Sequence, residues 1–146
     1  MSDAAIAHEL LAKASHGTLA TIGLRPAGHP FASLVAVAND ASRPLLLLSS
    51  LAEHTKNLEA DGRASILLAE AGLAAARVTI LGACARVPDA EREAARAIFL
   101  AAHPDAAQYV DFEDFGFWRI EPAELRVVVG FGRMSWVSRE TFLHKR

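Results

Sequence analysis

The feature that most constrains the fold is the shortness of the connections between strand-like segments in the first half of the chain. Residues 18–25, 31–39 and 45–50 read as strands, and only the turn-forming residues 26–30 and 39–44 separate them. A pair of parallel strands needs a crossover of about a dozen residues or more. The three segments therefore predict an antiparallel meander and argue against a parallel α/β sheet.

The remainder of the chain is predicted to add helices and more strands. Gly17 and Gly62 are interpreted as the ends of the first two helices, Gly82 as a bulge or bend within a long strand, and Pro122 as a turn. Ser2 and Asp3 are candidate caps for the first helix. Helices are expected over residues 4–15, 53–61, 88–103 and 138–143, and strands over 64–70, 76–87, 115–121 and 125–132. This order favours a closed or partly closed β-barrel with helices at its rim.

Composition excludes several classes of protein. The 146 residues are 52% hydrophobic and carry a net charge of -2, which predicts one domain over residues 1–146 and argues against nucleic-acid partners. No apolar run reaches the ~18 residues of a membrane helix, and the first residues are too acidic for a signal peptide. The single cysteine, Cys84, is interpreted as a small buried hydrophobe and points to the reducing cytoplasm. The six histidines show no compact metal-binding spacing, so no metal site is predicted.

The segment SSLAEHTKN, residues 49–57, is the most informative for chemistry. Two hydroxyl residues, Ser49 and Ser50, end a strand directly before a helix, and the helix N-terminus offers free N–H groups and partial positive charge. His54 and Lys56 add donors that complete a cradle for a dianionic phosphate. The alternative is that a serine simply caps the helix while His54 and Lys56 are solvated.

A second segment, FASLVAV, places Ser33 among the apolar residues of a strand. A planar aromatic ligand lying against this strand would take hydrogen bonds from its backbone N–H and C=O groups. The alternative is an ordinary strand that tolerates one serine.

A third segment, GFGRMSW at residues 130–136, only superficially resembles a dinucleotide-binding fingerprint. Ser135 stands where the last glycine belongs, and no βαβ unit follows. The two glycines instead indicate close backbone approach by a ligand or another subunit, with Arg133 offering charge to an anionic ligand. For Trp118 and Trp136, packing in the core or in a dimer is favoured over ligand stacking.

At these three segments the chain resembles the pyridoxamine 5′-phosphate oxidase-like, FMN-binding split-barrel superfamily, and within it the HugZ-type haem-utilisation branch. The matching strings are PFASLVAV, LLLLSSLAEHTKNLEADGRASILL and GFGRMSWV. The resemblance implies a mainly β (α+β) fold, a six- to seven-stranded antiparallel split β-barrel with peripheral helices. It covers nearly the whole chain.

The resemblance also implies which residues bind the cofactor. The FMN phosphate is assigned to Ser49, Ser50, His54 and Thr55, with Lys56 as a substitute cation. The resemblance further implies a homodimer whose FMN sites lie between the subunits. A second set of residues therefore contacts the flavin ring, either from the same chain or from the partner subunit. That set is Ser33, Leu34 and Val35 for the ring, and Gly132, Arg133 and Trp136 for the partner's contribution.

Two departures from the family limit the choice of activity. Pyridoxamine phosphate oxidases carry an arginine-x-histidine pair near the C-terminus, whereas Arg133 is followed here by Met134 and Ser135. Haem-degrading relatives carry a further C-terminal domain and a late histidine, to which His144 is not matched. The first hypothesis is an FMN-dependent oxidoreductase acting on an unidentified small substrate, with no catalytic side chain assigned. The alternatives are a non-catalytic flavin- or haem-binding protein and a dimeric domain without cofactor.

Overall fold

The computed structural model describes residues 1–73 and 75–144. The helices are α1 (Asp3–Lys13), α2 (Glu53–Ala60), α3 (Arg92–Ala102) and α4 (Arg139–His144), with 3₁₀ turns at Asp89–Glu91 and Pro104–Gln108. The strands are β1 (His16–Leu24), β2 (Ala27–Ala36), β3 (Ala38–Asp40), β4 (Arg43–Ser49), β5 (Arg63–Ala69), β6 (Ala76–Arg86), β7 (Phe115–Val129) and β8 (Met134–Ser138).

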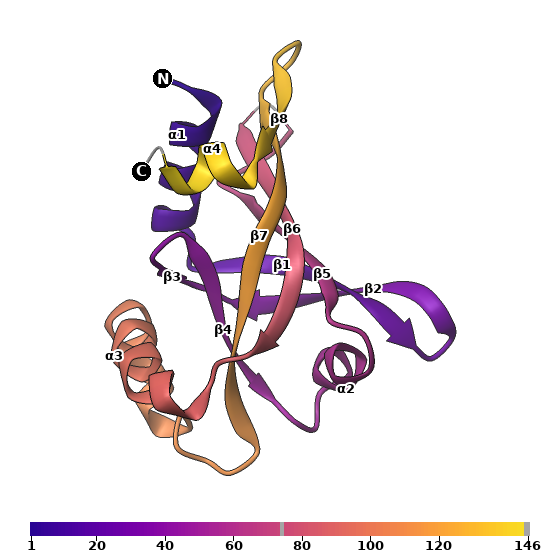
Figure 1. Ribbon diagram of the computed structural model, residues 1–146, viewed down its shortest axis with the longest axis vertical. Helices are drawn as coiled ribbons and strands as arrows, with labels where there is room; N and C mark the ends of the chain where they lie inside the picture. The colour runs from indigo at the N-terminus through magenta and orange to yellow at the C-terminus, as the bar shows by residue number, and fades with distance from the viewer. Residues whose placement is uncertain (74, 145–146) are drawn as a thin grey trace.

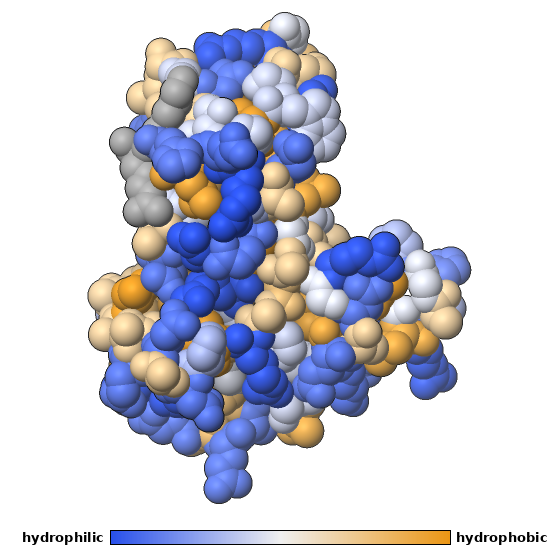
Figure 2. Space-filling view, in the orientation of Figure 1, coloured by the Kyte–Doolittle hydropathy of each residue, from blue (hydrophilic) through white to orange (hydrophobic). Residues whose placement is uncertain are grey.

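All strand pairs among the described residues are antiparallel, which confirms the mainly β split-barrel class. The predicted meander was wrong in part, because the segment 31–39 is divided into β2 and β3, and β4 pairs with β3 and β7 rather than with β2. The strands follow the order β2-β1-β5-β6-β7-β4-β3, and β8 pairs with β7. Figure 1 shows β6 and β7 running along the long axis, with β1 and β2 crossing them and projecting to one side. That projection, together with α2, forms the arm that stands out from the body in Figure 2. Helices α1 and α4 lie together at the end opposite α2 and α3 (Figure 1).

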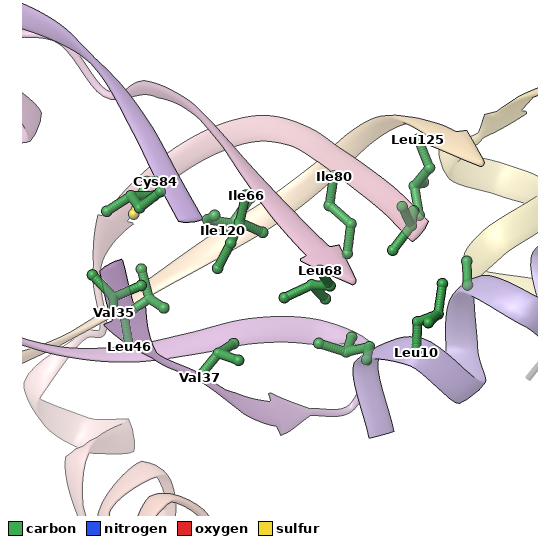
Figure 3. Close-up of a cluster of buried hydrophobic side chains, with 14 of the residues drawn as sticks. Leu10, Val35, Val37, Leu46, Ile66, Leu68, Ile80, Cys84, Ile120 and Leu125 are labelled. Carbon is green, nitrogen blue, oxygen red and sulfur yellow. The ribbon is translucent and has the colours of Figure 1, made fainter. Parts of the chain in front are cut away.

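The core lies between the curved sheet and α1. Strand residues alternate between buried and exposed positions, so one face of each strand supplies the apolar side chains. Figure 3 shows Leu68, Ile80 and Leu125 from three strands pointing toward Leu10 of α1. Ser2 caps α1 as predicted, because its hydroxyl accepts the Ala5 N–H at 3.1 Å. No helix in the described part of the chain is long and apolar enough to cross a membrane.

The strand β7 differs from the prediction. Residues 115–121 and 125–132 were expected to form two strands separated by a turn at Pro122, but one strand of 15 residues, Phe115–Val129, runs through both. The register against β6 shifts between Leu81 and Gly82, so β7 bends and Pro122 lies at a bulge. A proline lacks the N–H that a ladder requires and is tolerated at such a site. The bulge predicted at Gly82 is confirmed, whereas β8 was not predicted.

The predicted roles of two other glycines were wrong. Helix α1 ends at Lys13 with Ala14 as its cap, and α2 ends at Ala60 with Asp61 as its cap. Both caps are extended, a conformation that any residue adopts, so neither helix end needs the left-handed backbone that favours glycine. Gly17 lies in β1, where a Cβ atom would stand 2.7 Å from Leu68 Cδ2.

We expect Gly82→Ala to lower the free energy of unfolding by about 3 kcal/mol, because overpacking a strand forces backbone movement. A Cβ atom at Gly82 would lie 1.9 Å from the carbonyl oxygen of Glu121, and a backbone atom cannot yield as a flexible side chain does. Urea denaturation measures the change. The exposed neighbour Ala83→Ser is the control and should change stability by less than about 0.5 kcal/mol. Equal stability of the two variants would contradict this account of the bulge.

Candidate functional site

A cavity of about 310 Å³ lies where β2 and β4 approach each other without pairing. Strand β2 pairs with β1 along one edge, and β3 covers β4 only as far as Leu45. Backbone groups of β2 and of residues 46–49 therefore face this opening without a partner strand in the described chain. The lining residues are Leu34, Val35, Ala36, Leu47, Leu48, Ser49, Ala52, His54, Tyr109 and Phe115.

The turn between β4 and α2 is held by hydrogen bonds from its serine and threonine residues. The Ser49 hydroxyl accepts the Leu51 N–H at 3.1 Å and donates to Asp114 Oδ2 at 3.0 Å. The Ser50 N–H donates to the Asp114 carbonyl at 2.6 Å. Thr55 is buried, and its hydroxyl donates to the Ser49 carbonyl at 2.6 Å. In this arrangement Ser49 and Thr55 fix the shape of the turn.

The N-terminus of α2 is open. Its cap residue is Ala52, and no side chain accepts a hydrogen bond from the first turn. The alternative in which Ser49 or Ser50 caps this helix was therefore wrong, because Ser49 accepts from Leu51 before the helix begins. An uncapped first turn leaves N–H groups and partial positive charge directed toward an external acceptor.

His54 connects α2 to β2 across the opening. Its Nδ1 lies 3.1 Å from Ser33 Oγ, and the imidazole lines the cavity. Burial lowers the pKa of His54 below its ordinary value, so the ring is neutral at pH 7. When the Ser33 hydroxyl donates to Nδ1, the Nε2 atom carries the ring proton and can donate it to a ligand.

Sequence reasoning missed the residue that anchors α2. Asn57 is buried, its Nδ2 donates to Thr21 Oγ1 at 3.0 Å, and its Oδ1 accepts the Leu24 N–H at 3.0 Å. These two bonds fix the helix, and with it His54, against β1. The same side chain sits in the string HTKN, but only the fold shows that it faces inward.

The fold places four of the eleven predicted ligand residues in the wall of this cavity. Ser49 and His54 line it, and Ser33 is hydrogen-bonded to Nδ1 of His54. Leu34 is 72% exposed and Val35 is buried, so the strand presents one side chain outward and one inward at the cavity wall. Ser50 and Lys56 are exposed and lie beside the opening rather than in its wall. The binding role of every residue in this set stays a prediction.

The C-terminal segment lies elsewhere in the same chain. Gly132 and Arg133 lie between β7 and β8, at the end of the molecule opposite α2 (Figure 1). Arg133 donates to the carboxylate of Asp3 and to the Met1 carbonyl, which ties this turn to the N-terminus. The Ser135 hydroxyl also bonds Asp3 and holds the pKa of that carboxyl below its usual range. Trp136 is 60% exposed, with Arg126 over its ring at 5.3 Å. Within one chain, residues 130–136 therefore do not reach the cavity.

Asp114, Tyr109 and Phe115 were not predicted at the site. Asp114 Oδ2 accepts the Ser49 hydroxyl, because Ser49 pairs with the neighbouring Phe115 in the β4–β7 ladder. Aromatic residues spaced along 109–117 were the available signal. Their position depends on how β7 pairs with β4, which is a long-range contact.

Other reactive side chains serve the core. Cys84 is 2% exposed, and burial raises the pKa of its thiol to about 12, which fits the predicted small hydrophobe. His8 Nε2 contacts the Phe142 carbonyl at 2.6 Å, and His103 Nε2 contacts the Val37 carbonyl at 2.8 Å. Within residues 1–73 and 75–144, no three His, Cys, Asp or Glu side chains are grouped to hold a metal ion. The cytoplasmic location stays a prediction.

The antiparallel strands and the helices at their rim define a split-barrel protein of the α+β class. The chain belongs to the CREG β-barrel family, whose model matches residues 1–144. The family resemblance predicted from the three strings is thereby confirmed, including its haem-utilisation branch.

Three relatives illustrate the range of the class. The chain is 42% identical over 120 residues to the chloroplastic non-canonical heme oxygenase HOZ of Arabidopsis thaliana, covering 78% of this chain and 36% of that protein. It is 37% identical to a heme binding protein from Mycobacterium smegmatis, with a TM-score of 0.92, covering 99% of this chain and 61% of that one. A protein of the pyridoxinephosphate oxidase family from Clostridium acetobutylicum is 10% identical, with a TM-score of 0.77, covering 97% and 99% of the two chains, and shares the fold. The chain thus spans less than two thirds of each of the first two relatives.

We expect Asn57→Ala to lower the free energy of unfolding by about 2 kcal/mol, because one buried and one partly buried hydrogen bond are lost and the Thr21 hydroxyl loses its buried partner. The exposed neighbour Lys56→Ala is the control and should stay within about 0.5 kcal/mol of the parent protein. Urea titrations of the three proteins give the comparison. A loss no larger than that of the control would show that Asn57 does not anchor α2.

Proposed function

We propose that residues 1–146 form one FMN-binding domain that acts as a homodimer and serves as an oxidoreductase for a small substrate. The observation that carries this proposal is the cavity at the opening between β2 and β4. At one end it presents a neutral histidine and an uncapped helix N-terminus, and at the other it presents an apolar strand with unpaired backbone.

The described residues fit the two ends of FMN. The first turn of α2, Ser50 and His54 are suited to the phosphate, since each supplies an N–H or O–H that bonds no other described group in this arrangement. Lys56 adds positive charge on the same helix. Ser49 and Thr55 shape the turn that holds these donors.

The other end of the cavity suits the flavin ring. The backbone around Ser33, Leu34 and Val35 offers hydrogen-bonding groups beside an apolar surface, which is the combination that orients a planar ligand. When bound, FMN supplies hydride and single-electron transfer, and the protein contributes position, polarity and exclusion of water.

Haem is the second candidate ligand. The names of two relatives favour it, because one is a heme oxygenase and the other a heme binding protein. His144, which is exposed at the end of α4, is the residue to test as an axial ligand. This alternative describes a binding protein related to haem-utilisation proteins, without a flavin reaction.

We expect the purified protein to bind FMN, with an affinity that falls as the pH rises. Free His54 is neutral near pH 7, and a bound phosphate dianion favours its protonated form, so binding takes up a proton. Above pH 6.5 the phosphate itself stays mainly dianionic, because its second pKa is about 6. Calorimetry between pH 6.5 and 8.5 should therefore show the dissociation constant of FMN rising by up to about tenfold per pH unit.

Two variants and two ligands serve as controls for that measurement. His54→Gln should remove the pH dependence and weaken FMN, whereas His54→Lys should keep tight binding over the whole range. Riboflavin, which lacks the phosphate, should show no such dependence. Haem is titrated in parallel with the parent protein and with His144→Ala. A Soret shift that His144→Ala abolishes, together with no heat from FMN, would reject the flavin proposal in favour of haem binding.

The homodimer is supported by a row of residues on the outer face of the sheet. Strand register sets Leu34, Thr18, Leu67, Thr79, Arg126 and Trp136 directly opposite one another across six strands. Directly opposed residues share one face of a sheet. At about 4.8 Å per strand the row is roughly 24 Å long, with Leu34 at the cavity end and Trp136 at the far end.

A two-fold axis that passes between two such faces, at the middle of the row and perpendicular to it, would bring each end of the row against the opposite end of the partner subunit's row. Two curved faces that meet at Leu67 and Thr79 leave room at both ends of the row. Trp136 of the partner subunit then stands beside Leu34 and closes the cavity, with Gly132 and Arg133 of the same turn nearby. This arrangement gives the exposed indole a partner and explains how a segment remote in one chain serves the site.

We expect the parent protein to be a dimer and Leu67→Lys to raise its dissociation constant at least about tenfold, because a buried unpaired ammonium costs more than 1.4 kcal/mol. The same variant should weaken FMN. Leu73→Lys is the matched control, since Leu73 is 75% exposed and lies outside the row. Light scattering over a dilution series measures the dissociation constant of the dimer for both variants. A monomeric parent protein, or a Leu67→Lys variant as dimeric as the control, would contradict this interface.

A further inference from the structure

Two aromatic rings of the cavity have no role in the function proposed above. Tyr109 and Phe115 line it, with ring centroids 4.9 Å apart and ring planes tilted by 46°. Both rings are half-buried. A flat molecule lying parallel to one of them meets the other at an angle between stacked and edge-to-face, and both contacts are favourable for aromatic pairs.

The fold fixes this aromatic wall on the side of the cavity formed by β4 and the segment before β7. Phe115 stands opposite Ser49 in the ladder between β7 and β4. The Tyr109 N–H donates to the Ala106 carbonyl at 3.0 Å, and the Tyr109 carbonyl accepts the Phe112 N–H at 3.0 Å. Both rings are therefore held before a ligand arrives, which lowers the entropy cost of stacking against them.

The Tyr109 hydroxyl is the second notable feature. It makes no hydrogen bond within residues 1–73 and 75–144, although the ring is packed against Phe115. The cavity wall thus combines an apolar surface with one donor that has no partner in the described chain. The core alone does not require this combination, because a phenylalanine would pack equally well.

We infer that Tyr109 and Phe115 form the ring-selecting wall of the site, so that it takes a phosphate ester only when the ester carries a planar aromatic body. This rests on the proposed binding of FMN. The polar end recognises phosphate in any ester, whereas the wall discriminates by stacking. Replacing one wall ring by an aliphatic side chain should weaken FMN by about two- to tenfold.

The chain offers a direct readout, because Tyr109 is its single tyrosine. Protein labelled with 3-fluorotyrosine gives one ¹⁹F resonance, and a ring stacked on Tyr109 shifts it. We expect FMN and riboflavin to move the resonance and inorganic phosphate and ribose 5-phosphate to leave it in place. FMN that binds by calorimetry without moving the resonance would overturn the ring-selecting wall and leave the flavin site standing. Protein that takes up no FMN would overturn both.

Variants give an independent test. Tyr109→Leu should weaken FMN and riboflavin by the same factor, whereas Tyr109→Phe should keep the stacking contribution. Leu73→Ala is the control, because Leu73 is 75% exposed and does not line the cavity. Equal FMN affinity for Tyr109→Leu and Leu73→Ala would overturn the inference. If Tyr109→Leu fails to fold, the ¹⁹F measurement on the parent protein still decides.

Discussion

The site depends on one constraint, namely that β2 and β4 approach each other but do not pair. Backbone N–H and C=O groups at an unpaired strand edge need other partners, and a protein either covers such an edge or uses it. Here α2 and the loop before β7 flank the opening, so it becomes a cavity rather than an exposed edge. A planar ligand with its own hydrogen-bond donors and acceptors, as proposed above, would bond these two edges in place of a strand.

The surrounding residues give that opening a direction. Asn57 fixes α2 against β1, the turn bonds of Ser49 and Thr55 set where the helix begins, and His54 reaches back to Ser33. The polar end therefore rests on rigid elements, while the apolar end is a strand surface and two packed rings. A ligand with a charged tail and a flat body fits this gradient, which is why flavin phosphate is favoured over a compact polar molecule.

Local patterns succeeded where local physics decides the outcome. The Ser2 cap, the alternating strands and the bulge at Gly82 all follow from short-range sterics and hydrogen bonding, and all were predictable. The continuous β7 strand was not, because proline usually ends a strand and only the bulge in β7, where Pro122 stands opposite Gly82 of β6, accommodates it. The predicted helix caps at Gly17 and Gly62 were wrong for a related reason. Both helices end in an extended residue, which need not be glycine, and the close approach of Leu68 explains Gly17 instead.

By itself the sequence determined the antiparallel class and the approximate positions of the helices and of most strands, and it singled out residues 49–57, because periodicity, turn residues and helix starts are encoded within a few neighbours. Only the tertiary structure decided that Ser49 bonds Asp114, that Asn57 faces inward, and that Tyr109 and Phe115 stand beside His54. It also showed that the Trp136 segment lies far from the cavity of its own chain. These facts depend on which strands pair across about 30 to 75 residues of chain, and strand register over such separations is set by packing of the whole core.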